Sequence, residues 1–203
     1  MDPVSPILFT TERLYTREFT SNDAEAVYRY ASSIENSGFL PFCPESREDV
    51  GHFIERRLAD QIAEKRRCWD VAICLKETDE FIGSVSLALR ENGDQAEIGW
   101  ILDMRYWHNG YAVEAARGML RFGFLGLELH RIFARCDDKN KASYSVMERL
   151  GMRREAHFIK DEYTRVNGRP SWRSHFIYAM LQKEYLLSLP DGYVSPTGEN
   201  AGL

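Results

Sequence analysis

The chain has 203 residues, 44% hydrophobic and 28% charged, a balance typical of one globular domain with a sizeable core. Its formal net charge of −5 argues against a nucleic-acid-binding surface, which needs clustered lysine and arginine residues. No apolar run reaches the roughly 18 residues of a membrane span, and the N-terminus lacks the basic and apolar regions of a secretory signal. We therefore expect a cytoplasmic protein that binds neither nucleic acid nor membranes.

The cysteine and histidine residues show no spacing typical of a metal site or a redox motif. The four cysteines are scattered without a C-x-x-C pair, and the five histidines show no H-x-x-x-H spacing. We therefore predict no metal cofactor, and we expect reduced core or surface thiols at Cys43, Cys68, Cys74 and Cys136.

The first part of the chain predicts a strand followed by two helices. Residues 13–19 alternate as a strand does, and Asn22 or its neighbour Ser21 offers an N-cap for a helix over 23–31, with Glu25 completing a capping box. A proline-containing loop is expected over 35–46. It leads to a helix that Ser46 caps and whose apolar stripe consists of Val50, Phe53, Ile54, Leu58 and Ile62.

The rest of the chain predicts a meander followed by alternating helices and strands. Strands are expected over 69–76, 80–90 and 96–103, with Asn92-Gly93 as a strong hairpin signal. A wide apolar stripe predicts a buried helix over 112–125, and it precedes a strand over 130–138. A short helix between Asn140 and Gly151, a polar segment over 155–170 and a last strand over 171–181 complete the pattern.

This order predicts one mixed α/β (α+β) domain whose sheet is antiparallel at first and contains a parallel crossover later. We place an N-terminal extension at 1–10, the domain at 11–183 and a C-terminal tail at 184–203.

The stretch from Arg105 to Gly118, RYWHNGYAVEAARG, joins a strand to a helix and is a candidate anion site. Free backbone N–H groups and the helix dipole at such a corner attract phosphates. Gly110 suits a positive φ or a close approach of the backbone, Arg105 adds charge, and the small Ala112 leaves room for a ligand. The spacing alone fits an ordinary structural turn equally well.

A second candidate lies on the short helix, where positions 140, 143, 147 and 150 share one face. Met147 and Leu150 make that face apolar, yet Asn140 and Ser143 are polar. Asn140 is either only an N-cap with Ser143 a tolerated small residue, or both meet a ligand between this helix and the sheet.

Taken in order, the segments TERL, EIGWIL, YWHNGYAVEAA, LHRIFARCDDKNKAS and VMERLGM resemble the GNAT superfamily of acyl-CoA N-acyltransferases. The likeness covers residues 11–181. It is greatest to the RimJ/RimL type, which acetylates protein N-terminal amines. The resemblance implies a mixed sheet that splays at its central strand, with helices on both faces.

The resemblance also implies acetyl-CoA as co-substrate and assigns residues to it. The loop would hold the pyrophosphate by its backbone, and the central strand and Asn140 would bind the pantetheine arm, as in strand addition to a sheet edge. The residues so implied are Trp100, Ile101, Leu102, Arg105, His108, Asn109, Gly110, Tyr111, Ala112, Asn140 and Ser143.

Two positions depart from the pattern of the superfamily. His108 stands where a glycine is expected, although histidine tolerates positive φ better than most residues. Met147 occupies the place of a tyrosine general acid, and methionine has no proton to donate. RimL-like members instead use a serine in the N-x-x-S segment, which matches Ser143, and a glutamate after the L-G-M turn. Glu162 is the closest match to that glutamate in an ungapped reading, with Asp161 and Tyr163 as rivals.

Ser143 and Glu162 are thus the implied catalytic residues, although Glu162 fits an ordinary solvated loop acid equally well. A protein N-terminal amine, with a pKa of about 8, loses its proton more readily than a lysine amine at about 10.4. An N-terminal α-amine is therefore the leading acceptor. A small amine, such as an antibiotic or polyamine, and an inactive acyl-CoA-binding module remain alternatives.

Other features of the sequence have two interpretations each. Tyr106 and Trp107 either wedge the turn onto the core or pack on the cofactor, and Trp172 lines the acceptor groove or packs in the core. The acidic residues around 137–162 form a solvated face or attract a cationic acceptor. The acyl group and the oligomeric state, including a homodimer, stay open at this stage.

Overall fold

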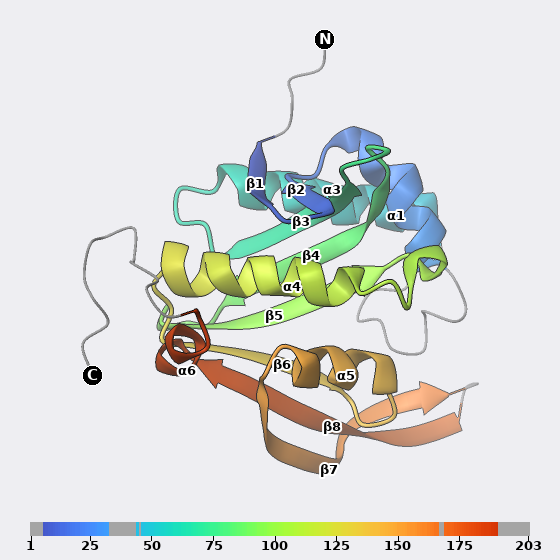
Figure 1. Cartoon of the computed structure of the whole chain (residues 1–203). Coiled ribbons are helices and arrows are strands. Elements are labelled where there is room, and N and C mark those ends of the chain that lie inside the picture. Colours follow the sequence, from blue (N-terminus) through green and yellow to red (C-terminus); the bar gives the residue numbers. More distant parts are fainter. Residues whose placement is uncertain (1–5, 33–43, 45, 167–168, 191–203) are drawn as a thin grey trace.

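The structure is a computed structural model that describes residues 6–32, 44, 46–166 and 169–190. Eight strands of this part form one sheet in the order β1-β2-β3-β4-β5-β6-β8-β7 (Figure 1). The strands are β1 (Ile7–Thr10), β2 (Leu14–Arg17), β3 (Cys68–Leu75), β4 (Phe81–Leu89), β5 (Gln95–Leu102), β6 (Arg131–Asp137), β7 (Arg153–Val166) and β8 (Arg169–Leu181). The helices are α1 (Ala24–Ala31), α3 (Arg47–Ile62), α4 (Tyr111–Arg121), α5 (Lys141–Arg149) and α6 (Gln182–Leu187).

The sheet consists of two antiparallel parts joined by one parallel pair of strands. Strands β1 to β5 form an antiparallel meander, and β6, β8 and β7 form the second antiparallel part. Strands β5 and β6 pair in parallel from Gln95↔Arg131 to Glu97↔Phe133. Beyond Glu97, β5 stays paired with β4 as far as Leu102, while β6 stays paired with β8 as far as Asp137. The two strands therefore diverge, which confirms the splayed sheet that the family resemblance implied.

Helices cover both faces of the sheet, and each face has its own apolar cluster. Successive side chains of β3 point to opposite faces of the sheet. Val71 and Ile73 therefore pack in the larger cluster, and Ala72 and Cys74 pack in the smaller one. The larger cluster includes residues of α4 and α5, and the smaller includes residues of α1 and α3. Figure 1 shows α4 lying across the central strands.

The predicted helix caps are confirmed at one helix and wrong at another. Ser46 caps α3, because its side chain accepts a hydrogen bond from the backbone N–H of Asp49. Before α1, the capping box is formed by Thr20 and Asp23 rather than by Asn22 and Glu25. The Asp23 carboxylate takes part in the capping box and is also held in a 2.7 Å ion pair with Arg17.

The apolar stripe of α3 is confirmed except at its end. Val50, Phe53 and Ile54 are buried and Leu58 is half-buried, whereas Ile62 is 87% exposed. Ile62 is the last residue of the helix, where the chain turns away from the sheet. The predicted loop over 35–46 lies outside the described residues except for positions 44 and 46, and Cys43 lies outside them too. Cys74 and Cys136 are buried thiols, as expected.

Two segments with weak sequence signals have regular structure. The polar segment over 155–170, expected to be a loop, belongs mainly to β7, a strand at the sheet edge. Its register with β8 shifts between Phe158 and Glu162, which obscures the alternation. Helix α6 begins at Gln182 and extends into the segment from residue 184 onward that we placed in the tail, and its Tyr185 is buried against Phe124 with ring centroids 5.0 Å apart.

The predicted helix over 112–125 changes geometry before its end. It is α-helical as far as Arg121 and continues as a π-helical turn over Phe122–Gly126. No helix within the described residues is long and apolar enough to cross a membrane.

Candidate functional site

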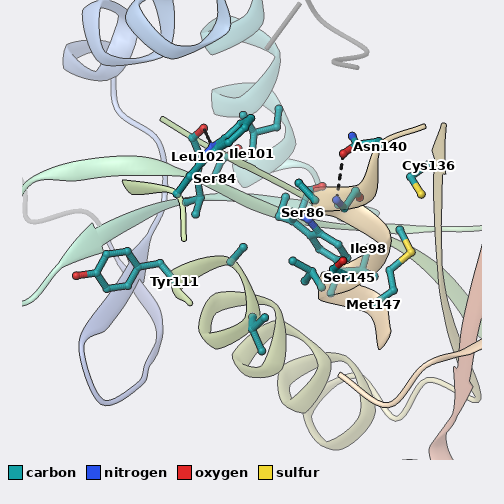
Figure 2. A pocket seen from close by; sticks show the side chains of 18 of the residues that line it. Ser84, Ser86, Ile98, Ile101, Leu102, Tyr111, Cys136, Asn140, Ser145 and Met147 are labelled. Atoms are coloured by element: carbon teal, nitrogen blue, oxygen red, sulfur yellow. Dashed lines mark hydrogen bonds between the residues drawn. The ribbon is translucent and has the colours of Figure 1, made fainter. Parts of the chain in front are cut away.

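A cavity of about 820 Å³ opens where β5 and β6 diverge. This is within the size range of sites for small molecules and cofactors. Its walls come from β4, β5 and β6, from the start of α4, from α5 and from one side of α3. Figure 2 shows Cys136, Asn140, Ser145 and Met147 on one side of this space and Ser84, Ile101 and Leu102 on the other.

The free edge of β5 forms one wall of the cavity. Trp100, Ile101 and Leu102 line it, and this part of β5 pairs with β4 but not with β6. Backbone N–H and C=O groups on the side facing β6 are therefore available to a ligand, and buried backbone groups require a partner. An extended ligand chain can add to this edge as another strand would.

The loop after β5 is held by the carboxylate of Asp103, which is 6% exposed. Its Oδ1 accepts a hydrogen bond from the backbone N–H of Arg105 at 3.1 Å, and its Oδ2 is bound by the guanidinium groups of Arg105 at 2.9 Å and Arg29 at 3.1 Å. Burial of Asp103 raises its pKa, but the hydrogen bonds and charge of Arg105, with the help of Arg29, outweigh this effect and leave the pKa below its ordinary value.

The same loop brings backbone N–H groups to the start of α4. His108 has φ of 62° and Gly110 has φ of 80°, so both adopt the left-handed conformation. This confirms that a histidine with positive φ can occupy the position where glycine was expected. Tyr111 begins α4, whose first N–H groups and dipole favour an anion. His108, Gly110, Tyr111 and Ala112 all line the cavity.

A residue of the TERL segment clamps this loop from outside. The guanidinium of Arg13 donates to the carbonyl of Asn109 at 3.1 Å, binds the Glu114 carboxylate at 2.7 Å and lies 4.5 Å from the centre of the Tyr111 ring. Glu114 also accepts a 2.6 Å hydrogen bond from Thr11. These contacts join the TERL segment to the start of α4, a link that sequence reasoning missed.

Helix α5 confirms that Asn140 is an N-cap and places it with Ser143 in the lining of the cavity. Its Oδ1 caps the helix by accepting from the Ser143 backbone N–H at 3.1 Å (Figure 2), and Asn140 and Ser143 both line the cavity. Met147 is 1% exposed and lines the cavity from the same helix. The neighbouring Cys136 thiol has its pKa raised to about 11 by burial, against a smaller opposite effect of a hydrogen bond with Ser143. The Ser143 side chain is thus close to Cys136, and both residues line the cavity.

The described residues that line the cavity do not include Arg105, Asn109 or Glu162. The Arg105 guanidinium binds Asp103 and Glu80 instead, and the Asn109 amide donates to the carbonyl groups of Tyr106 and Trp107. The side chains of both residues therefore shape the loop, and their predicted ligand role stays a prediction.

Glu162 lies on β7 and reaches the cavity wall only through Arg135. Its Oε2 is 3.1 Å from the Arg135 guanidinium and 3.2 Å from Nε2 of His175. Asp161 binds the same two residues, at 3.0 Å and 2.7 Å. Arg135 itself lines the cavity. Neither acid is a free loop residue, since both belong to one ion-paired cluster.

The other acidic residues of this region also have partners. Glu155 binds Arg131 and Arg153, Asp137 lies 3.9 Å from the Arg173 guanidinium, and Oδ2 of Asp138 lies 2.9 Å from Nε2 of His157. The predicted acidic face is therefore largely neutralised and does not form an unpaired acceptor for cations. No group of three or more His, Cys, Asp or Glu side chains in the described part of the chain is arranged to hold a metal ion.

The aromatic residues are now placed. Trp107 packs against the main core and donates its indole N–H to the carbonyl of Leu102 at 3.0 Å, and Tyr106 and Trp107 also line the cavity, so both interpretations of these two residues stand. Trp172 is 55% exposed and meets Tyr163 edge-on at 5.5 Å. The interpretation that Trp172 packs in the core is therefore wrong. Trp172 is also not among the described residues that line the cavity.

Sequence reasoning missed one half of the cavity. Its lining also includes Arg57, Asp70, Ser84, Ser86, Glu97 and Arg135. The alternation Ser84, Ser86 on β4 and the isolated charges Asp70 and Glu97 in apolar strands were the available signals. They become meaningful once the register places Asp70 beside Ser86 and Ser86 beside Gly99.

Comparison with known proteins gives a consistent result. Residues 13–153 match a family model described as an acetyltransferase (GNAT) domain. The uncharacterized N-acetyltransferase YnaD of Bacillus subtilis is 35% identical over 176 residues, which cover 87% of this chain and 98% of YnaD. The crystal structure of a GNAT-family acetyltransferase from Bacillus anthracis is 32% identical with a TM-score of 0.75, and the match covers 86% of this chain and 98% of that one.

A more distant structure shows the fold alone. RimL, a ribosomal L7/L12 alpha-N-protein acetyltransferase solved in complex with coenzyme A, is 18% identical with a TM-score of 0.75. The match covers 87% of this chain and 98% of RimL.

Asp103 provides a test of the loop. We expect Asp103→Asn to lower the free energy of unfolding at pH 7 by about 2 kcal/mol, because it weakens charge-assisted bonds to two arginines. The pKa of Asp103 is lower in the folded state, so its contribution is fully present above the unfolded-state value of about 3.9 and is lost as the pH falls through the folded-state value.

Urea denaturation at several pH values measures this contribution. The difference between wild type and Asp103→Asn should be constant near neutral pH and shrink below about pH 4. Asp94→Asn, at an exposed carboxylate, is the control and should change stability little. An Asp103→Asn variant as stable as wild type at pH 7 would show that the carboxylate does not hold the loop.

Proposed function

The chain belongs to the GNAT acetyltransferase family and is an N-acetyltransferase, and from this premise we propose that its acceptor is the α-amine of a protein or peptide N-terminus. Members of this family use acetyl-CoA. The observation that carries the proposal is the cavity at the divergence of β5 and β6, where the phosphate-type loop, the free edge of β5 and the Asn140–Ser143 face meet.

The residues present fit acetyl-CoA as co-substrate. The backbone from His108 to Ala112 would bind the pyrophosphate, and the edge of β5 from Trp100 to Leu102 would pair with the pantetheine arm. Asn140 would use its amide N–H groups, because its Oδ1 already caps α5. Lys139, Lys141 and Arg149 line the α5 side of the cavity and suit an anionic co-substrate.

The proposed reaction is direct attack on the thioester. The amine attacks in its neutral form, and its nitrogen forms a bond to the acetyl carbonyl carbon. The C–S bond breaks, and the sulfur leaves as a thiolate. The nitrogen, which is positively charged after the attack, loses one proton to a base. Main-chain N–H groups near Leu102 would stabilise the oxyanion. Thiols ionise at a pKa of about 8.5, so the leaving group needs only a hydrogen-bond donor.

Ser143 is the proposed donor to that sulfur. It lines the cavity beside Met147, a side chain without a proton to give. Glu162 is the proposed base and would accept the proton through water or through His175, while Arg135 orients its carboxylate. Glu97 is a structural rival, because its carboxylate lines the cavity itself. Asp161 is a weaker rival: burial raises its pKa, but the hydrogen bond and charge of His175 and the charge of Arg135 outweigh this and lower it.

The amine class is favoured by its acid–base chemistry. An N-terminal amine with a pKa of about 8 is partly unprotonated at neutral pH, whereas an alkylamine near 10.4 must lose its proton at greater cost. Acetylation of a small amine is the second candidate.

The experiment that tests the function combines calorimetry with an acceptor screen. We expect acetyl-CoA to bind with a Kd in the micromolar range, on the order of −8 kcal/mol, and coenzyme A to bind comparably. N-terminal peptides should then be acetylated faster than spermidine or aminoglycosides. Binding without transfer to any of these amines would instead favour an acyl-CoA-binding module, and absence of binding would contradict the site.

We expect Ser143→Ala to lower the turnover number by about tenfold and to raise the KM for acetyl-CoA by less, since the lost bond forms to the departing sulfur. Steady-state kinetics measures both. Ser145→Ala, which removes a hydroxyl from the same helix and cavity wall, is the matched control and should change turnover little. An unchanged turnover number for Ser143→Ala removes Ser143 from catalysis.

We expect Glu162→Gln to lower kcat at pH 7 by roughly a hundredfold, the lower end of the effect of a general base, and to flatten the acid limb of the pH–rate profile. Asp161→Asn should have a smaller effect, because its lowered pKa makes it a poor proton acceptor. A loss that occurs in Glu97→Gln and not in Glu162→Gln would assign the base to Glu97.

A further inference from the structure

An arginine and a buried carboxylate form a fixed pair in the half of the cavity beneath α3. Nε of Arg57 is 2.6 Å from Oδ2 of Asp70, and the guanidinium carbon lies 4.4 Å from the centre of the Phe53 ring. Arg57 is on α3 and Asp70 on β3, and both line the cavity. Two contacts, one polar and one aromatic, thus hold the guanidinium plane in place.

The outer nitrogens of Arg57 have no hydrogen-bond acceptor in the described part of the chain. Nη1 lies 3.8 Å from Oδ2 of Asp60, which is too long for a hydrogen bond. The Arg57 side chain is 23% exposed. A half-buried guanidinium with unused donors directed by fixed partners is a ready site for an oxygen acceptor of a ligand.

Burial of the Asp70 carboxylate is energetically unfavourable, and its place on strand β3 alone does not explain it. It is 8% exposed, and among the described residues its Oδ1 is buried without a partner at hydrogen-bond geometry, although the Ser84 hydroxyl is near enough to help lower the pKa of Asp70. Burial raises the pKa of Asp70, and the charge and hydrogen bond of Arg57 oppose that rise. An unsatisfied buried oxygen is rare in native structures, and keeping one is consistent with a functional need to orient Arg57.

The strand register gives the distance of this pair from the free edge of β5, along which the acyl donor would lie. Asp70 is opposite Ser86, and Ser86 is opposite Gly99, the residue before Trp100 on the free edge of β5. Two strand spacings place the backbone of Asp70 about 10 Å from that of Gly99. An extended peptide covers about 3.3–3.6 Å per residue, so this distance corresponds to the first two or three residues of an acceptor.

We infer that Arg57 binds a carbonyl or carboxylate oxygen within the first three residues of a peptide acceptor, and that Asp70 is a positioning residue for Arg57. The inference rests on the proposed function and selects its acceptor class. Glu97, two residues before Gly99 on β5, adds a carboxylate to the lining of the same cavity. A guanidinium and a carboxylate in one cavity suit a molecule with both an amine and an oxygen acceptor. A polyamine offers no oxygen, and its second ammonium would be repelled by Arg57.

The test compares peptide and alkylamine acceptors in Arg57 variants. Arg57→Gln should raise the KM for a pool of short peptides by about tenfold or more, the loss expected for one charge-assisted hydrogen bond. The KM for acetyl-CoA and the activity towards propylamine, an amine without an oxygen, should stay within about twofold. Arg56→Gln is the matched control, because Arg56 is the exposed neighbour on the same helix.

Arg57→Gln alone leaves the Asp70 charge buried without its counter-ion and is therefore expected to reduce stability. The double variant Arg57→Gln/Asp70→Asn removes both charges and keeps the test valid if the single variant does not fold. Asp70→Asn alone should raise the peptide KM less than Arg57→Gln does, and Arg57→Lys should restore only part of the affinity.

Each result decides between the proposals. A selective rise in the peptide KM supports the inference. An unchanged peptide KM in Arg57→Gln and in the double variant overturns it and leaves the proposed acceptor class intact. A wild-type protein that acetylates propylamine or spermidine but no peptide overturns both proposals, and equal losses for peptides and propylamine assign Arg57 to structure alone.

Discussion

The divergence of β5 from β6 is the constraint on which the site depends. Each strand keeps its antiparallel partner to its end, β5 with β4 and β6 with β8, so the parallel pairing between them stops at Glu97 and Phe133 (Figure 1). An interior sheet edge is thereby left open beside a cavity. Backbone polar groups in such a place require a partner, and an extended ligand can provide one without any side chain of special type.

The walls of this opening are fixed by contacts outside it. The Asp103 carboxylate binds Arg29 and Arg105 on one side of the loop, and the Glu114 carboxylate binds Thr11 and Arg13 on the other. Positive φ angles at His108 and Gly110 then need no compensation from the ligand, because these ion pairs already hold the turn. A loop fixed before binding loses less entropy when it binds, which favours affinity for a phosphate group.

The sequence predicted what depends on local patterns and missed what depends on register. Alternation and turn residues were sufficient for β3, β4 and β5, and the N-cap at Asn140 placed α5. The edge strand β7 was missed because its register shifts between Phe158 and Glu162 and its charges are neutralised by partners far away in the sequence. Asp70, Ser86 and Gly99 come together only across strands, so no spacing along the chain could reveal the α3 half of the cavity.

The two halves of the cavity differ in how their charges are held, and this difference bears on what each can bind. On the α5 side, Lys139, Lys141 and Arg149 are surface cations on flexible stems, suited to the phosphates of the proposed co-substrate, whose position the loop backbone would fix. Beneath α3, Arg57 is immobilised by Asp70 and Phe53, at the cost of the buried Oδ1 of Asp70. Immobilised charge contributes selectivity more than affinity, because a partner without the matching group meets an unpaired guanidinium. Selection among amines is therefore expected from the α3 half, and retention of the acyl donor from the α5 half.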